Sequence, residues 1–281
     1  GNVAAIHPIR DGVITDFEMT SKLLTELVRR VVKNSIIKPR MIVSVPSSIT
    51  EVEERAVIQA ATEAGARRVY LIEEPLAACL GASLDISTPK GRMVVDIGGG
   101  TTDIGILSMN AVANSASIKV AGVAFDEAIM KYVRKKYGLI IGRNTAEEAK
   151  HSIGCVYERP ERLEYVVKGR NVKNGLAGEV VLTGDDMLEA LKRPARQIVE
   201  RVLDVLETST PELVSDIAEN GIVLTGGGSR IYGMDRLLQD FTQMNCMTAD
   251  DADSCVAFGC GRSIAWMNHM QENTINIARR R

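Results

Sequence analysis

The sequence predicts an α/β protein with two lobes, and three observations lead to this fold class. Apolar strand-like segments alternate with amphipathic helical segments along most of the 281 residues. The strand-like segments fall into two separated groups, which favours one sheet-containing lobe for each group. Two of them run directly into three consecutive glycines, Gly98–Gly100 and Gly226–Gly228.

The composition is that of an ordinary soluble globular protein, with 45% hydrophobic and 25% charged residues. A formal net charge of −2 gives no general attraction to nucleic acid, so no nucleic-acid partner is expected. No apolar run reaches the roughly 18 residues that span a bilayer, and no signal peptide opens the sequence. We therefore expect a cytoplasmic protein. Its five scattered cysteines are expected to be reduced and buried, without a zinc site.

In the group of segments nearer the N-terminus we expect helix, strand, helix, strand and short helix. Their predicted spans are residues 17–32, 41–45, 50–64, 69–72 and 76–81. Apolar residues at helical spacing predict the first helix, with Leu23, Leu24, Leu27, Val28 and Val31 on one face and Lys22, Arg29 and Arg30 facing away. Thr50 and Glu53 have the spacing of a capping box, which predicts where the second helix begins.

The remaining sequence predicts the second lobe. Strands are expected at 93–95, 103–109, about 117–121, within 157–182, and at 221–224; helices are expected at 125–137, from 145, at 187–206 and at 234–241. Thr183 is a predicted helix cap. Pro194 lies inside a helical pattern and predicts a kink or a break there.

The sequence Asp96-Ile97-Gly98-Gly99-Gly100-Thr101-Thr102-Asp103 places glycines, hydroxyls and two carboxylates at one turn. Without a Cβ, glycine lets the backbone approach a ligand, and the amides of such a turn can face phosphate oxygens. Neither glycine run has the spacing of a P-loop or a Rossmann fingerprint. A tight turn without a ligand would explain either run alone. The two together favour one nucleotide held between two lobes.

At this point the residues resemble the MreB family of bacterial actin-like proteins, in the superfamily of actin, sugar kinases and heat-shock chaperone ATPases. The resemblance covers essentially the whole chain, including residues 8–16 (PIRDGVITD), 71–78 (LIEEPLAA), 93–103 and 224–238 (LTGGGSRIYGMDRLL). It implies an actin-like ATPase fold with a mixed sheet and flanking helices in each lobe. It also implies a first lobe over 1–88, a second over 89–256 with a subdomain inserted at about 125–188, and a return to the first lobe over 257–281.

The resemblance further implies ATP and Mg²⁺ as cofactors and gives individual residues roles. Asp96 would hold water on Mg²⁺, Glu74 would orient the attacking water, and Thr101 would help to position it, which suits phosphoryl transfer. Glu147 and Lys150, three residues apart on one helix face, would contact the ribose. The nucleotide contacts implied at the two turns are Gly98, Gly99, Gly100, Thr101, Thr102, Gly226, Gly227, Gly228 and Ser229.

Simpler interpretations of these residues stay open. Glu74 alone could be a surface carboxylate at the end of a strand. Glu147 and Lys150 could form a solvated pair on a helix surface, with a weak contact between them.

Two departures from the family pattern affect these expectations. The family's first phosphate loop, an Asp-Leu-Gly-Thr type turn, is absent, because the sequence begins at Gly1 in the middle of the pattern. We therefore expect a fragment that lacks the opening strands of the first lobe: inactive alone, from a parent with weak ATPase activity. Val123-Ala124 stand where the family commonly has an acidic residue after Gly122, which puts one polar contact near the phosphates in doubt.

The functional expectation from the resemblance is a cytoskeletal protein that polymerises with itself. Its filaments would lie on the inner face of the cell membrane and organise the cell-wall elongation machinery, which maintains rod shape. Ile36 and Ile37 align with the hydrophobic pair through which some members touch the membrane. Alternatively, both isoleucines begin the buried strand at 41–45. The alternative function is a monomeric, chaperone-like or regulatory ATPase of the same fold.

Overall fold

The computed structural model describes residues 6–32, 37–266 and 275–277. A five-stranded mixed sheet, in the order β12-β11-β5-β6-β7, forms the centre of the larger lobe. Its strands are β5 (Arg92–Ile97), β6 (Thr102–Ser108), β7 (Ala111–Ile118), β11 (Ile222–Thr225) and β12 (Cys246–Thr248). Because β5 and β11 are parallel neighbours, with Asp96 opposite Thr225, the two glycine turns that follow these strands lie side by side.

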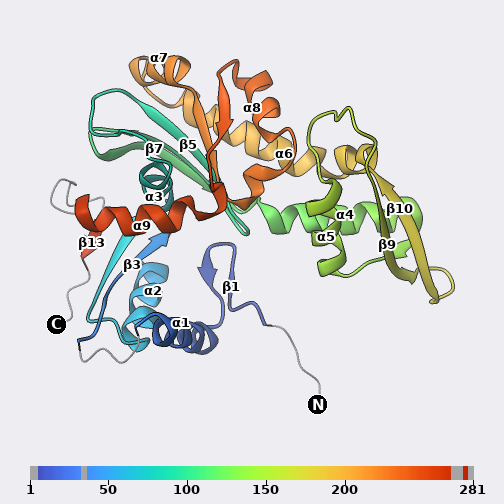
Figure 1. The fold of residues 1–281 in the computed structure, drawn as a ribbon, viewed down its shortest axis with the longest axis horizontal. Helices are drawn as coiled ribbons and strands as arrows, with labels where there is room; N and C mark the ends of the chain where they lie inside the picture. Colours follow the sequence, from blue (N-terminus) through green and yellow to red (C-terminus); the bar gives the residue numbers. More distant parts are fainter. Residues whose placement is uncertain (1–5, 33–36, 267–274, 278–281) are drawn as a thin grey trace.

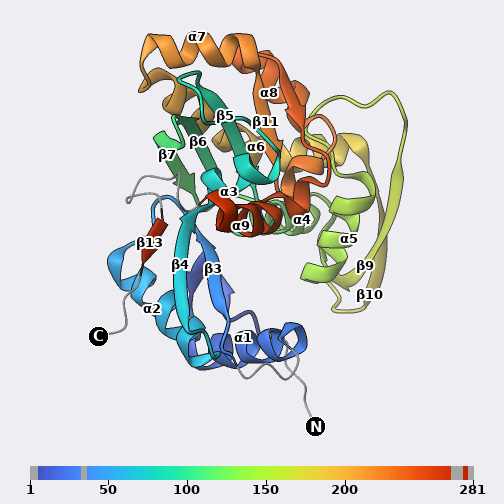
Figure 2. The ribbon, with the colours of Figure 1, turned by 60° about the vertical axis from the view of Figure 1, so that its left-hand side comes forward.

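A smaller lobe is built on the three-stranded sheet β13-β4-β3. Its strands are β3 (Arg40–Val45), β4 (Arg68–Glu73) and β13 (Ile275–Ile277), and its helices are α1 (Phe17–Val31) and α2 (Glu51–Glu63). The alternating apolar side chains of β3 and β4 pack against α2. A two-stranded hairpin, β1 (Ile9–Arg10) with β2 (Val13–Ile14), precedes α1. Figure 2 shows this lobe below the five-stranded sheet.

Two helices lie between the sheets, α3 (Glu74–Gly81) and α9 (Cys255–Trp266), and both figures show α9 crossing the middle of the molecule (Figures 1 and 2). They approach closely because each presents a glycine to the other's backbone. A Cβ on Gly81 would collide with the backbone of Cys255, and one on Gly259 with the backbone of Ala77. The chain segments at 74–81 and 255–266 are therefore packed as one unit.

The part of the chain between β7 and β11 first extends away from the five-stranded sheet and then returns to it (Figure 1). It contains α4 (Gly122–Tyr137), β8 (Leu139–Ile140), α5 (Arg143–Ile153), β9 (Glu164–Asn171), β10 (Ala177–Thr183), α6 (Gly184–Glu207) and α7 (Pro211–Asn220). After β11 follow η1 (Gly227–Arg230), α8 (Met234–Thr242) and η2 (Ala252–Ser254). One apolar core joins the five-stranded sheet to α4, α5, α6 and α8.

The α/β class, the alternation of elements and both capped helices agree with the prediction. Thr50 and Glu53 form the expected capping box, and Thr183 forms another with Asp186. The residue boundaries expected for the lobes stay a prediction. The five cysteines are free, and four of them are buried.

Two elements differ from what the sequence predicted. The strand expected at about 117–121 is β7, which begins at Ala111 directly after a tight turn at Met109 and Asn110. Both turn residues have positive φ without being glycine, so the usual sequence signal for such a turn is missing. Pro194 does not break α6, because apolar residues before and after it, Leu191 and Ile198, are anchored in the same core.

The apolar face predicted for α1 is only partly buried. Leu23, Leu27 and Val31 are exposed, and Val31 is 82% exposed. Leu24 and Val28, which belong to the same predicted face, are partly buried. The spacing of apolar residues predicted the helix correctly. It does not show which of these apolar side chains other elements bury.

Candidate functional site

The first glycine turn connects β5 and β6 as a hairpin and lies against the start of α4. The amide of Gly98 donates to the carbonyl oxygen of Thr101 at 2.9 Å, which closes the turn. The amides of Gly122 and Val123 donate to the carbonyl oxygens of Gly98 and Gly99 at 3.1 and 2.8 Å. The amides of Gly99, Gly100 and Thr101 donate to no residue that the structure describes. Three backbone donors at this turn are therefore available to an anion.

The β1–β2 hairpin contacts the other side of the turn. Its two-residue loop, Asp11-Gly12, has positive φ at both residues, and a Cβ on Gly100 would press on the amide of Asp11. Asp11 and Gly12 line the same cavity of about 730 Å³ as the glycine turn, which we call the turn cavity. Sequence reasoning missed this contribution, although Asp-Gly between short apolar segments is a strong signal for a type I′ hairpin.

Asp96 reaches this cavity from the end of β5. Its Oδ1 atom accepts a hydrogen bond from the hydroxyl of Thr225 at 2.6 Å, so it links the two glycine turns. Burial, together with the nearby charge of Asp103, raises the pKa of Asp96 to about 6, although the Thr225 hydroxyl opposes this. The carboxyl group can therefore be ionised at neutral pH and act as an acceptor for water or a cation.

Glu74 is the first residue of α3 and also lines the turn cavity. It is brought close to β6 because Pro75 packs directly on Gly105, where a Cβ would collide with the proline ring. Burial, and then the negative charge and hydrogen bond of Asp103, raise the pKa of Glu74 to about 9. Without a cation in the cavity, burial and the charge of Asp103 therefore favour the protonated form of Glu74.

Asp103 is the partner of Glu74 and was not among the expected site residues. Its side chain is completely buried, and Oδ1 accepts a hydrogen bond from the backbone amide of Ser47 at 3.1 Å. This bond ties β6 to the loop that follows β3, next to the cavity. The only sequence signal for Asp103 was its place as the second carboxylate of the motif that begins at Asp96. The spacing of the motif did not predict that this carboxylate is buried.

A second cavity, of about 610 Å³, meets the turn cavity at four shared residues, Gly98, Gly99, Gly227 and Asp253. We call it the α5 cavity, because Glu147 and Lys150 line it from α5. Lys150 is buried, with its Nζ 2.7 Å from Oδ1 of Asp126 and 3.1 Å from the carbonyl oxygen of Gly122. An ammonium group has three donors, so one is left for a ligand. The side chain of Glu147 is about half exposed.

The second glycine turn forms the wall between the two cavities. Gly226 has a φ of 79°, and a Cβ there would collide with the carbonyl oxygen of Ile97, so only glycine fits. Its amide donates to the carbonyl oxygen of Ala252 at 2.7 Å, and the Ser229 hydroxyl donates to its carbonyl oxygen at 2.7 Å. No atom lies within 4 Å of the position that a Cβ on Gly227 would take, so this residue leaves room beside both cavities.

Most of the predicted site residues lie together around the two cavities. Those that line a cavity are Glu74, Asp96, Gly98, Gly99, Gly100, Thr101, Glu147, Lys150, Gly226, Gly227 and Gly228. Thr102 and Ser229 line neither. The hydroxyl of Thr102 donates to the carbonyl oxygen of Val120 at 2.7 Å, and that of Ser229 is used inside its own turn. Both hydroxyls therefore shape the turns that present the neighbouring residues.

The two cavities together fit a nucleotide with its metal ion. Free amides and small residues at the first turn suit phosphate, while Glu147 and the remaining Lys150 donor suit the hydroxyls of a sugar. No group of three or more metal-ligating side chains could hold a metal ion among the residues described. Asp96 would therefore bind Mg²⁺ together with phosphate oxygens and water, which is the usual arrangement for this ion. When bound, the ion would supply charge stabilisation for phosphoryl transfer.

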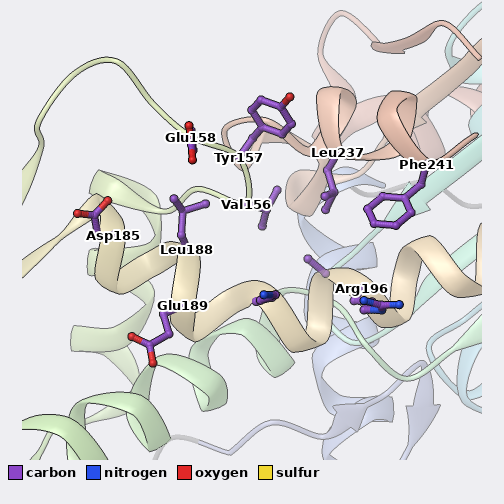
Figure 3. A pocket seen from close by; sticks show the side chains of 11 residues that line it. Val156, Tyr157, Glu158, Asp185, Leu188, Glu189, Arg196, Leu237 and Phe241 are labelled. Carbon is purple, nitrogen blue, oxygen red and sulfur yellow. The ribbon is translucent and has the colours of Figure 1, made fainter. Parts of the chain in front are cut away.

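Another cavity, of about 690 Å³, lies between α6 and α8 and has different chemistry. Figure 3 shows Val156, Leu188, Leu237 and Phe241 around this space, with charged side chains such as Asp185 and Arg196 near its edges. It has neither a glycine turn nor a group of buried carboxylates. The turn cavity and the α5 cavity are therefore the better candidate for a catalytic or nucleotide site.

Of the predicted membrane pair, Ile36 lies outside the residues that the structure describes. Ile37 is 69% exposed, and β3 begins only at Arg40. The alternative that the pair begins the buried strand is therefore wrong for Ile37. In the described parts of the chain, no helix has both the length and the apolar character needed to cross a membrane.

Comparison with known proteins gives one consistent family. The model of the family described as MreB/Mbl protein matches residues 1–272. The cell shape-determining protein MreB of Escherichia coli K12 is 47% identical over 94% of this chain and 77% of its own length. The cell shape-determining protein Mbl of Bacillus subtilis 168 is 39% identical over 98% of this chain and 83% of its own length.

Solved structures agree with this result. MreB5 of Spiroplasma citri bound to ADP superposes with a TM-score of 0.88, at 35% identity, over 95% of this chain and 80% of that one. A MamK double helical filament gives a TM-score of 0.81 at 23% identity, over 92% of this chain and 80% of that one, and so shares the fold. The expected actin-like fold is confirmed by these comparisons.

Proposed function

The chain belongs to the MreB/Mbl protein family, and from that premise we propose that it is an ATP-dependent, actin-like cytoskeletal protein that forms membrane-associated filaments. These filaments lie on the cytoplasmic face of the membrane and organise the cell-wall elongation machinery. Nucleotide hydrolysis weakens contacts between subunits. Relatives named as cell shape-determining proteins support the role in morphogenesis.

One observation carries the nucleotide part of the proposal. The two cavities meet at the glycine turns, with buried carboxylates at one end and Glu147 and Lys150 at the other. The free amides of Gly99, Gly100 and Thr101 contact the β- and γ-phosphates, and the α5 residues contact the ribose. The ADP bound to the Spiroplasma citri protein supports a nucleotide ligand.

The residues of the turn cavity divide the hydrolytic work. Asp96 would hold water on a bound Mg²⁺, and Thr101 would position the attacking water together with Glu74. Glu74 must be ionised to orient this water, and a cation beside Asp96 lowers the pKa of a neighbouring carboxyl. Because the pKa of Glu74 is raised, its carboxyl group would ionise, and so orient water, only when a nucleotide is bound with its metal ion.

Substitution Glu74→Gln, made in the full-length protein, tests the proposal. ATP should still bind, within about threefold of the unchanged protein, because the amide is similar in size. Steady-state hydrolysis should fall by about 100-fold or more, since a positioned base contributes roughly 10²- to 10⁴-fold. The control is Glu73→Gln, because Glu73 is the adjacent carboxylate and lines neither cavity.

Light scattering and electron microscopy with ATP test polymerisation in the same samples. Filaments should form with the unchanged protein and persist longer with Glu74→Gln. Equal hydrolysis by both glutamine variants would contradict the role of Glu74. Particles that bind and hydrolyse ATP but stay monomeric would favour a chaperone-like or regulatory ATPase instead.

A further inference from the structure

Arg159 lies in the wall of the α5 cavity, in the segment that follows α5. Two backbone contacts fix this segment to the loop after η1. Cys155 forms a β-bridge with Tyr232, and the amide of Val156 donates to the carbonyl oxygen of Tyr232 at 3.0 Å. The position of Arg159 relative to the cavity is therefore determined by the fold on both sides.

The guanidinium group of Arg159 is stacked on an aromatic ring. Its central carbon lies 4.1 Å from the ring centroid of Tyr232. Arg236 also lies over this ring, at 5.7 Å, but it does not line the cavity. Stacking fixes the plane of a guanidinium and leaves the N–H donors at its edge free for a ligand.

Arg159 differs from the other cations of the α5 cavity in having no carboxylate. Lys150 pairs with Asp126, Arg230 lies 3.4 Å from Asp253, and His151 lies 3.9 Å from Glu147. Arg159 makes no hydrogen bond or ion pair with any residue in the described part of the chain, and its Nε atom is buried. Protein atoms cover this Nε, so a ligand acceptor would meet the guanidinium at its two Nη groups, whose N–H donors no described residue accepts.

The place of Arg159 identifies which part of a nucleotide it would meet. With phosphates at the first glycine turn and the ribose at Glu147 and Lys150, the base occupies the end of the α5 cavity lined by Gly154, Arg159 and Tyr232. A guanidinium only donates hydrogen bonds. Guanine presents an acceptor oxygen at position 6, whereas adenine presents an amino group that is itself a donor.

We propose that Arg159 is a specificity-determining residue that donates to the oxygen at position 6 of a purine, so that 6-oxopurine nucleotides bind more tightly than ATP. This inference rests on the proposed nucleotide-binding function and refines its choice of base. ATP remains a ligand, bound without the contact to Arg159. A bidentate contact between arginine and guanine discriminates by roughly 1–3 kcal/mol, which corresponds to about 5- to 150-fold in affinity.

Calorimetry with the Mg²⁺ complexes of ATP, ITP and GTP tests the inference. ITP differs from ATP in the group at position 6 (and the attendant N1 proton) and lacks the 2-amino group of GTP. The unchanged protein should bind ITP and GTP about tenfold more tightly than ATP. Arg159→Gln should bind ITP and GTP within about threefold of ATP, with little change in ATP affinity. Arg159→Lys keeps the positive charge but loses the paired N–H donors of the guanidinium, so its preference should lie between those of Arg159→Gln and the unchanged protein.

The matched control is Arg236→Gln, which removes the other arginine from the same ring and should leave the ratio of ITP to ATP affinity unchanged. Thermal melting of each variant checks that it is folded. Loss of ATP and ITP affinity by the same factor in Arg159→Gln would overturn the inference, as would an unchanged ratio. Binding without base preference in the unchanged protein overturns this inference alone, whereas no binding of any nucleotide overturns the proposed function as well.

Discussion

At the scale of single residues, three carboxylic acids at the first glycine turn make the site sensitive to pH. Glu74, Asp96 and Asp103 all have raised pKa values, chiefly because they are buried. No basic side chain forms an ion pair with any of them among the residues described. Such a cluster favours the binding of a cation, because the alternative is the uptake of protons.

We expect the stability of the nucleotide-free protein to fall as pH rises, in part through Glu74. A carboxyl whose pKa is raised in the folded state contributes stability below its unfolded pKa, near 4.5, and loses it as pH rises through about 9. Urea denaturation at pH 5 to 9, without Mg²⁺, measures this slope. Glu74→Gln should flatten it, whereas an equally steep slope in the variant would show that Glu74 is not responsible.

The Lys150–Asp126 pair gives a second prediction at this scale. Both side chains are at least nine-tenths buried, so Lys150→Met leaves an unpaired buried carboxylate and should cost about 3–5 kcal/mol. Lys131→Met is the control, because Lys131 and Glu127 form an exposed pair on the same helix as Asp126, worth about 0–1 kcal/mol. Chemical denaturation compares the two. Similar small losses would mean that Lys150 is not structurally required.

At the scale of elements, glycine determines how closely α3 and α9 pack. Gly259 faces the backbone of Ala77. For Gly261, two residues later in the same helix, no atom of another element lies within 4 Å of the position that a Cβ would take. The position of Glu74 at the start of α3 depends on this contact. Sequence alone gives no difference between the two glycines, since both lie in one helical segment.

Gly259→Ala should therefore destabilise the protein by about 1–3 kcal/mol, because the new methyl group meets backbone that cannot move aside. Gly261→Ala should instead be neutral or stabilising by up to about 1 kcal/mol, as alanine is the better helix former. Thermal unfolding of both variants measures the difference. A stabilising Gly259→Ala would show that α3 and α9 separate easily.

Asp186 joins α6 to α4 and gives another prediction for elements. Its carboxylate accepts hydrogen bonds from Lys136, Tyr132 and Tyr137 and from the amide of Thr183. Burial raises its pKa, but these hydrogen bonds outweigh that effect and lower the pKa to about 2. The stabilisation is therefore present above the ordinary value near 3.8 and is lost as pH falls toward 2.

We expect Asp186→Asn to lower the melting temperature at pH 7 and to reduce the loss of stability between pH 4 and 2. Thermal melts at several acidic pH values measure both effects. The control is Asp185→Asn, the neighbouring residue in the first turn of α6. Equal acid sensitivity of the Asp186 variant and the unchanged protein would contradict the assignment.

At the scale of the whole molecule, the membrane part of the proposed function depends on many weak contacts. Burial of two isoleucine side chains contributes only a few kcal/mol, so a monomer binds weakly and a filament binds through avidity. The 69% exposure of Ile37 makes it accessible for such insertion. Membrane binding should therefore depend on polymerisation.

Sedimentation with anionic liposomes tests this dependence. The double change of Ile36 and Ile37 to Ser should abolish lipid binding in the presence of ATP without preventing filament formation. Val52→Ser, which removes another exposed apolar side chain of the same lobe, is the control and should leave binding intact. Undiminished lipid binding by the double variant would rule out insertion of this pair.

The sequence by itself determined the α/β class, most helices and strands, the capping box at Thr50, the helix cap at Thr183 and the two glycine turns. These features depend on local periodicity and on short-range hydrogen bonds, which residue types and spacing express directly. The family resemblance added Glu74, Asp96, Glu147 and Lys150, and the tertiary structure brings these residues to two adjoining cavities.

Only the tertiary structure decided which neighbours complete the site. Asp103 beside Glu74, Asp126 beside Lys150 and Tyr232 beneath Arg159 are each far apart in sequence and meet because separate elements pack together. In the same packing, the hydroxyls of Thr102 and Ser229 donate to backbone carbonyl oxygens and do not face a cavity. Part of the apolar face of α1 stays exposed. Burial and partnership depend on long-range contacts, so local pattern could predict the residues of the site but not their surroundings.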